Sequence, residues 1–431
     1  MGVYPASKKD TVFFFINSAS IFLFFALSLS IKSGYSYGPA LLILFALFSL
    51  PWWAKNIRLQ RAHYWFLLVL LLSALVGFSD AIRAGADAGD YNRPARYLAC
   101  MLLFVYFTVY PPRARWIWWG VAIGAIGAGV SAIYYTYFNI PPVWRAAKYL
   151  NPIQFGDSAA LLATLCLCGL VATYKKHHLL FTMLILGALL ALVASILSES
   201  RGSWLALMIW FVVLIVLALF YFKNAKNYGL ILVGFLLIVM ATFFTIGGET
   251  TLKRINEVTQ QISLYTEKGQ DHRSIGARLS MWRFGLHEGM SYPIFGANRA
   301  QMLEDKKVWV AEGRAGEAIV NLGHLHNEFI DRFAITGIVG LVILLALFLY
   351  PLGFFLRKPT NTHLHDHSAE QRILALKMAG VTTVIMHMGF GLTQVSLNAH
   401  NSGFMLYVIP VSLFFALLAA KNTDEYKLRS C

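Results

Sequence analysis

The feature that most constrains the fold of this chain is a series of apolar segments, most of them long enough to cross a lipid bilayer. A bilayer core is roughly 30 Å thick and takes about 20 helical residues to cross. No water is available there, so each backbone polar group needs an internal partner and each span must be helical. The expected fold is therefore an all-α polytopic membrane protein with about twelve transmembrane helices. We predict spans at residues 11–31, 38–53, 64–79, 95–110, 116–138, 155–173, 179–197, 203–222, 228–247, 333–356, 373–392 and 402–420.

The composition agrees with a membrane protein. Of the 431 residues, 58% are hydrophobic and 13% are charged, which excludes an ordinary soluble protein. Lys8 and Lys9 precede the first span, and no small-residue cleavage site follows it, so we expect a retained helix and not a signal peptide.

The placement of Lys and Arg predicts the orientation of the chain, because cytoplasmic loops are enriched in positive charge. With the N-terminus in the cytoplasm, these loops hold most of the excess that gives the formal net charge of +15. The polar segment 248–332 is balanced, with eleven Lys/Arg and eleven Asp/Glu. We predict that both termini are cytoplasmic and that this long loop is external, and the charge gives no reason to invoke nucleic acid.

The chain divides into three parts by this reasoning. Residues 1–247 form an N-terminal membrane region of about nine helices, 248–332 form the external loop, and 333–431 form a C-terminal membrane region of about three helices with a short tail. Within the loop we expect an amphipathic helix on the membrane surface. Its apolar face is predicted to consist of Ile275, Leu279, Trp282, Leu286 and Met290.

Neither the cysteines nor the histidine tract predicts a metal site or a disulfide. Cys166 and Cys168 point in different directions on a helix, so core packing is expected. His363, His365 and His367 have metal-like spacing but lie in a polar cytoplasmic loop, where solvation is expected. We therefore predict no metal and no cofactor.

Three basic residues from separate segments are expected at the external face. Arg201 lies in a tight turn, Arg278 opens the amphipathic helix and His326 precedes the tenth span. Either arginine could instead contact lipid headgroups, and the histidine could donate to a neighbour at the helix start. Together, however, an imidazole can accept a proton from a hydroxyl, and guanidiniums can bind phosphate oxygens.

This combination suits a hydroxyl acceptor and a donor with a diphosphate leaving group. No ATP is supplied outside the cytoplasm, so the donor must arrive activated, as a lipid-linked diphospho-sugar does. Arginine would then neutralise the leaving diphosphate, as a metal does in many sugar transferases. The sequence contains no Asp-x-Asp motif.

These residues make the chain resemble the O-antigen ligase family, within the group that includes O-antigen polymerases and bacterial protein O-oligosaccharyltransferases. The resemblance covers the span layout, the Ser200-Arg201-Gly202 turn and the Arg278-x-x-x-Trp282 helix. It also covers His326-Asn327 followed after nine residues by Gly337-x-x-Gly340, a glycine pair expected to be flexible. Pro293-Ile-Phe-Gly296 looks familial, but Ala297-Asn298 departs from the second glycine often found there.

The resemblance implies a GT-C-like fold and a transfer of O-antigen polysaccharide from undecaprenyl diphosphate to a hydroxyl of lipid A–core oligosaccharide. The reaction would be inverting, independent of metal and ATP, and located at the periplasmic face of a Gram-negative inner membrane. Carried over to this chain, His326 would be the general base and Arg201 and Arg278 would bind the diphosphate. Asn327 and Arg332 are further candidates beside the base.

Other polar residues near the external face were weighed as well. Asp157, Arg145 and Lys148 are candidates for the donor portal, although loop solvation is favoured for them. The polar residues before the last span are candidates for lining the site: Asn398, His400 and Asn401.

Rival functions remain open. An O-antigen polymerase has a similar donor and no distinguishing short motif. A protein O-oligosaccharyltransferase usually carries a soluble domain after the last span, where this sequence has about eleven residues. A polytopic transporter is disfavoured, because the spans carry few charged residues and show no internal repeat.

Overall fold

The computed structural model describes residues 8–139, 145–147, 149–221, 274–357 and 367–419. All regular elements in these ranges are helices, which confirms the all-α polytopic fold. Among the described residues, eight helices are long and apolar enough to cross a membrane, and a bent pair, Gly34–Phe48 and Leu50–Asn56, would be a ninth.

Eleven described helices coincide with predicted spans, and the remaining prediction, 228–247, lies outside the described residues. They are α1 (Lys8–Leu27), α2 (Gly34–Phe48), α4 (Arg61–Arg83), α5 (Asn92–Val109), α6 (Ala114–Ile133), α7 (Pro152–Thr173), α8 (His178–Leu197), α9 (Arg201–Tyr221), α14 (Glu328–Leu356), α15 (His367–Gly391) and α17 (Asn401–Ala419). Short helices α3 (Leu50–Trp53), η1 (Ala54–Asn56), η2 (Tyr134–Phe138) and α16 (Ser396–Ala399) lie between them.

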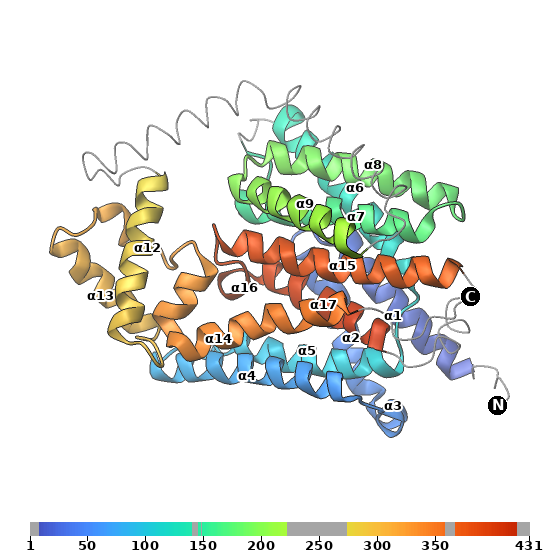
Figure 1. The fold of residues 1–431 in the computed structure, drawn as a ribbon, viewed down its shortest axis with the longest axis horizontal. Coiled ribbons are helices and arrows are strands. Elements are labelled where there is room, and N and C mark those ends of the chain that lie inside the picture. The colour runs from blue at the N-terminus through green and yellow to red at the C-terminus, as the bar shows by residue number, and fades with distance from the viewer. Residues whose placement is uncertain (1–7, 140–144, 148, 222–273, 358–366, 420–431) are drawn as a thin grey trace.

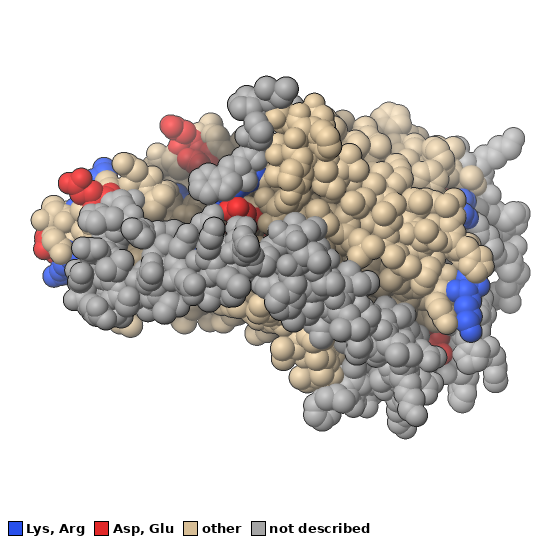
Figure 2. All heavy atoms as spheres, turned by 90° about the horizontal axis from the view of Figure 1, so that it is seen from above, with Lys and Arg blue, Asp and Glu red and all other residues tan. Residues whose placement is uncertain are grey.

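The long helices run side by side along one direction, with α12 (Ser274–Ser291) and α13 (Arg299–Ala311) at one end of the bundle (Figure 1). Helix α7 lies at the centre, with its whole apolar window buried. Cys166 and Cys168 on this helix are buried free thiols, as their core assignment predicts. On the described surface in Figure 2, uncharged side chains cover the broad bundle, and charged ones gather at its ends and on the α12–α13 region.

Helices α12 and α13 build a small core of their own with the short helix η3 (Glu317–Ile319) and the start of α14. Its largest members are Met281, Phe284, Met302, Trp309 and Leu325. Helix α12 runs across the direction of the bundle helices (Figure 1), as a helix on a membrane surface would.

The apolar face predicted for α12 is one of two apolar sides of this helix. Leu286 and Met290 on that face are 43% and 70% exposed, whereas Met281 and Phe284 on another face are buried. The helix is therefore apolar on two sides. One side packs on α13 and α14, while the other stays open. The open side includes Leu286 and Met290 of the predicted face, and the core-facing side was not predicted from the sequence.

Helix α14 begins at Glu328, five residues before the predicted span, because the side chain of Asn327 caps it. Its Oδ1 accepts hydrogen bonds from the backbone N–H groups of Phe329 and Ile330 at 3.0 and 3.1 Å. Such a cap satisfies N–H groups that have no partner within the helix.

The helix is then broken at Gly337, which has φ 63° and ψ −162°. The backbone N–H of Ile338 donates to the carbonyl of Pro293 at 2.8 Å, and that of Ala297 donates to Ala334 at 2.9 Å. A Cβ atom on Gly337 would lie 2.3 Å from the carbonyl oxygen of Ile294. Two backbones cross closely at this glycine, so the position requires a residue without a Cβ atom.

Asn298 occupies the turn where the sequence departs from the familial glycine. It has φ 67° and caps α13, with its Oδ1 accepting a hydrogen bond from the N–H of Gln301 at 3.1 Å. Asparagine tolerates positive φ better than most residues, so the turn keeps a conformation that suits glycine.

Candidate active site

His326 lies in the loop between η3 and α14, held from both sides. Before it, the N–H of Leu325 donates to Oδ1 of Asp331 at 3.0 Å, and after it Asn327 caps the helix. His326 itself has φ 50°, a conformation uncommon for residues other than glycine. The loop is thus fixed by α14, and the imidazole position follows from that anchoring.

The imidazole of His326 is partly buried and uncharged. Burial, the neighbouring His324 and the positive charge of Arg278 lower its pKa to about 3, while a hydrogen bond with the side chain of Gln394 opposes the shift. The near-neutral pKa of an unperturbed imidazole therefore does not apply here. Because it is neutral at physiological pH, the ring has a lone pair available to accept a proton.

Arg201 is the first residue of α9, and the turn before it packs onto the start of α7. The Ser200 hydroxyl donates to Oδ1 of the buried Asp157 at 3.1 Å. A Cβ atom on Gly156 would lie 2.1 Å from Oγ of Ser198, so the close approach requires glycine. Arg145 holds the turn from outside, since its Nε donates to the Ser198 carbonyl at 2.9 Å.

Arg278 lies on α12 within electrostatic reach of this turn. Burial lowers its pKa first, the charge of Arg201 lowers it further, the carboxylate of Asp157 raises it and Arg145 lowers it. Arg145 and Arg201 therefore both act on Arg278 with like charge, beside the side chain of Asp157. Like charges that gather in this way repel one another, and a bound anion would relieve the repulsion.

The structure brings the three principal candidates together. The charge of Arg201 acts on Arg278 and the charge of Arg278 acts on His326, although the three residues come from α9, α12 and the loop before α14. This cluster of Arg145, Arg201 and Arg278 is called the arginine cluster below. The neutral imidazole of His326 lies within electrostatic reach of this cluster.

Asn327 and Arg332 have hydrogen-bond partners outside the arginine cluster. Asn327 caps α14, and its Nδ2 donates to the carbonyl of Leu392 at 3.1 Å, so both ends of its amide have backbone partners. Arg332 instead donates to Oδ1 of Asn398. Lys148 lies outside the described residues, and the solvation favoured for Asp157 is wrong because its side chain is buried.

Sequence reasoning missed the turn after α15. Gln394 is buried beside His326, and a Cβ atom on Gly202 would lie 2.3 Å from Oγ1 of Thr393. Both residues follow the predicted end of an apolar span, where a polar pair looks like an ordinary boundary. His324, whose ring centroid lies 4.4 Å from that of His326, had a visible signal in the His-x-His spacing.

No group of three or more His, Cys, Asp or Glu residues suited to a metal ion occurs within the described ranges. The tract at His363 and His365 lies outside them.

The fold and the site together define a polytopic membrane protein with a polar, anion-attracting site at one end of its helix bundle. A family model described as O-antigen ligase matches residues 186–345, which include Arg201, Arg278 and His326. An O-antigen ligase of Escherichia coli K12 is 26% identical over 383 residues, covering 83% of this chain and 82% of the relative. An uncharacterized protein of Haemophilus influenzae is 26% identical over 401 residues, covering 89% and 94%.

These matches confirm the resemblance to the O-antigen ligase family. They support a glycosyl-transferring membrane enzyme of the group that joins or polymerises lipid-linked glycans.

Proposed function

We propose that this chain is an O-antigen ligase that transfers polysaccharide from undecaprenyl diphosphate to a hydroxyl of lipid A–core oligosaccharide. The observation that carries the proposal is the convergence of His326 with Arg201 and Arg278 from three separate segments. An acceptor hydroxyl needs a base, and a diphosphate leaving group needs positive charge. Both requirements are met within one neighbourhood.

In the proposed reaction the acceptor oxygen attacks the anomeric carbon of the donor sugar. A new C–O bond forms, the hydroxyl proton passes to the neutral imidazole of His326, and the bond from the anomeric carbon to phosphate oxygen breaks. The electron pair leaves with undecaprenyl diphosphate. Attack from the face opposite the leaving group inverts the anomeric centre.

Arg201 and Arg278 would bind the diphosphate as the charge on its bridging oxygen develops. Guanidiniums are planar and donate two parallel hydrogen bonds to adjacent phosphate oxygens. Their permanent charge performs the neutralisation for which many glycosyltransferases use a metal. Arg145 and Asp157 would position the turn that carries Arg201.

We also propose that the site faces the periplasm, with both termini cytoplasmic and the chain divided at 247/248 and 332/333 as the sequence predicts. The start of α1 and the end of α17 lie at the end of the bundle opposite α12 and α13 (Figure 1). That arrangement agrees with the distribution of positive charge.

A deletion strain separates the ligase from the polymerase. Without a ligase, lipid A–core carries no O-antigen at all, whereas without a polymerase it keeps a single repeat unit. We expect the deletion strain to lose all O-antigen from lipid A–core, measured on lipopolysaccharide gels, and the wild-type chain to restore it. A ladder reduced to one repeat would instead favour a polymerase.

A further inference from the structure

A cavity of about 230 Å³ lies on another side of the His326 loop, among α4, α5, α13, α14 and the start of α17. Its polar lining includes Arg93, Arg96, Arg332, Asn398, His400 and Asn401. The last three are the residues that the sequence offered as candidates for lining the site. The arginine cluster contributes no residue to it.

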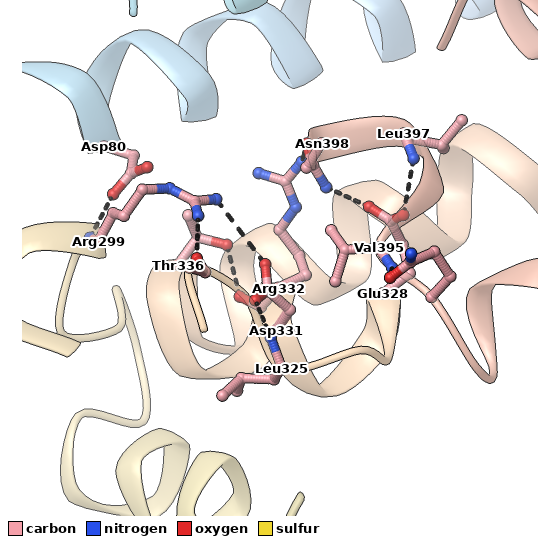
Figure 3. Close-up of polar contacts among 12 residues, drawn as sticks. Asp80, Arg299, Leu325, Glu328, Asp331, Arg332, Thr336, Val395, Leu397 and Asn398 are labelled. Atoms are coloured by element: carbon pink, nitrogen blue, oxygen red, sulfur yellow. Dashed lines mark hydrogen bonds and ion pairs between the residues drawn. The ribbon is translucent and has the colours of Figure 1, made fainter. Parts of the chain in front are cut away.

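The cavity is basic, because its acidic residues are largely engaged by other groups. Oδ1 of Asp80 accepts a hydrogen bond from the backbone N–H of Arg299 at 3.0 Å, and Oδ2 of Asp331 lies 3.8 Å from the guanidinium of Arg299. The Glu328 carboxylate, behind the wall, accepts from the N–H of Leu397 at 2.8 Å and from the amide of Asn398 (Figure 3). Asp90 is the remaining acidic residue of the lining.

Two arginines of the cavity donate to neutral groups. Arg96 donates to the amide oxygen of Asn401, and Arg332 donates to that of Asn398 (Figure 3). Neither of them, nor Arg93, forms an ion pair within the described part of the chain. The positive charges of Arg93 and Arg96 are therefore available to a ligand, whereas that of Arg332 is shared with Asp80 and Glu328.

A row of three imidazoles joins the cavity to the proposed base. The ring centroid of His400, in the lining, lies 5.7 Å from that of His324, which lies 4.4 Å from that of His326. The charge of Arg93 acts on His400 and His324, whereas the charge of Arg278 acts on His326. The two basic regions thus lie at opposite ends of the row.

We propose that this cavity binds a phosphate group on the acceptor saccharide and thereby brings a hydroxyl of the same molecule to His326. The inference rests on the proposed function, since it assigns a place to the second substrate. A diphosphate donor accounts for the arginine cluster but not for a second basic region. The rings of His324 and His400 separate this region from the base, so the anionic group lies on a different sugar from the reacting hydroxyl.

The test uses purified full-length protein in vesicles with lipid-linked diphospho-glycan and lipid A–core that carries its core phosphates. Arg93→Gln and Arg96→Gln should each raise the acceptor KM by about tenfold, the effect of losing one charge-assisted hydrogen bond, and leave the donor KM unchanged. Arg283→Gln is the matched control, because Arg283 is exposed on α12 and lies outside the cavity.

A second acceptor, lipid A–core from which the core phosphates have been removed enzymatically, tests whether phosphate is the group that binds. Its lipid A is left intact. The wild type and the two variants should then have similar acceptor KM values, because the ligand of the arginines is gone. A persistent tenfold difference, or unchanged acceptor KM with phosphorylated core, would overturn the proposal. Thermal midpoints and an Arg96→Lys variant, expected to recover part of the affinity, separate lost binding from lost folding.

The vesicle composition separates a glycan phosphate from a lipid headgroup. The effect of the substitutions should be the same in phosphatidylcholine vesicles with and without phosphatidylglycerol. An effect present only with phosphatidylglycerol would assign the cavity to headgroups and refute an acceptor site. If the wild type transfers no glycan at all, the proposed function fails, whereas normal KM values in active variants reject only the cavity.

Discussion

Replacement of Gly337 by alanine tests whether the break in α14 requires glycine. The residue has φ 63° and ψ −162°, a region open essentially to glycine alone. A Cβ atom there would lie 2.3 Å from the carbonyl oxygen of Ile294 and 2.7 Å from the N–H nitrogen of Gly296. Both contacts are with backbone, which cannot rotate away.

Two costs add in this variant. Holding alanine in such a conformation costs about 1–3 kcal/mol, and forcing extra volume into a packed site costs about 1–3 kcal/mol more. We therefore expect a loss of roughly 2–6 kcal/mol in the free energy of unfolding. The backbone hydrogen bonds between residues 293–298 and 334–339 would break first, because the clash lies among them.

Gly353→Ala is a matched control in the same helix, because a Cβ atom there meets nothing within 4 Å. An alanine in a helix interior is favoured over glycine by about 0.5–1 kcal/mol, so this variant should be neutral or slightly more stable. Thermal melting in detergent and hydrogen exchange of residues 293–298 measure the stability of both variants. Equal stability of the two variants would refute the reasoning.

Three further outcomes are expected. Arg201→Lys and Arg278→Lys should each lower kcat by about 100-fold or more although charge is kept, because lysine lacks the paired donors. Transfer assays decide this, and headgroup anchoring would leave both active. Because the pKa of His326 is lowered to about 3, the base stays deprotonated below pH 6.5 and kcat/KM should persist from pH 7 to 5. A pH–rate profile that halves near 6.5 would contradict it. Burial and Asp305 raise the pKa of Glu288 from 4.5 to about 8, so the unfolded state ionises first and stability falls as pH rises between these values. Glu288→Gln should raise the thermal midpoint at pH 8 and leave it unchanged at pH 4, and equal midpoints at pH 8 would contradict this.

Much of the membrane fold could be predicted from the sequence, because span length and hydropathy are local properties. The ends of spans were less accurate where a polar side chain set the boundary. Asn327 starts α14 five residues early, since a cap depends on one hydrogen-bonding residue and not on apolar content. The buried face of α12 was missed because Met281 and Phe284 pack against α13 and α14, which periodicity alone does not reveal.

The grouping of site residues could be anticipated only in part. Arg201, Arg278 and His326 were assigned to one membrane face, and the structure places them within reach of one another. The supporting residues were not foreseen. Asp157 looked like a loop residue, and its burial depends on the Ser200 turn, which is distant in sequence. Gln394 reaches His326 only because α15 ends beside α14.

The measurement that tests the central claim most directly is transfer by purified wild-type and His326→Ala protein, with lipid-linked diphospho-glycan and lipid A–core, in the presence of a chelator. His287→Ala is the control, because His287 is an exposed histidine on α12, away from the arginine cluster. We expect the wild type and the control to transfer polymer, and His326→Ala to be slower by about 100- to 10,000-fold with an unchanged thermal midpoint. Near-normal transfer by His326→Ala would remove this residue from the mechanism, and loss of wild-type transfer in chelator would contradict leaving-group stabilisation by arginine.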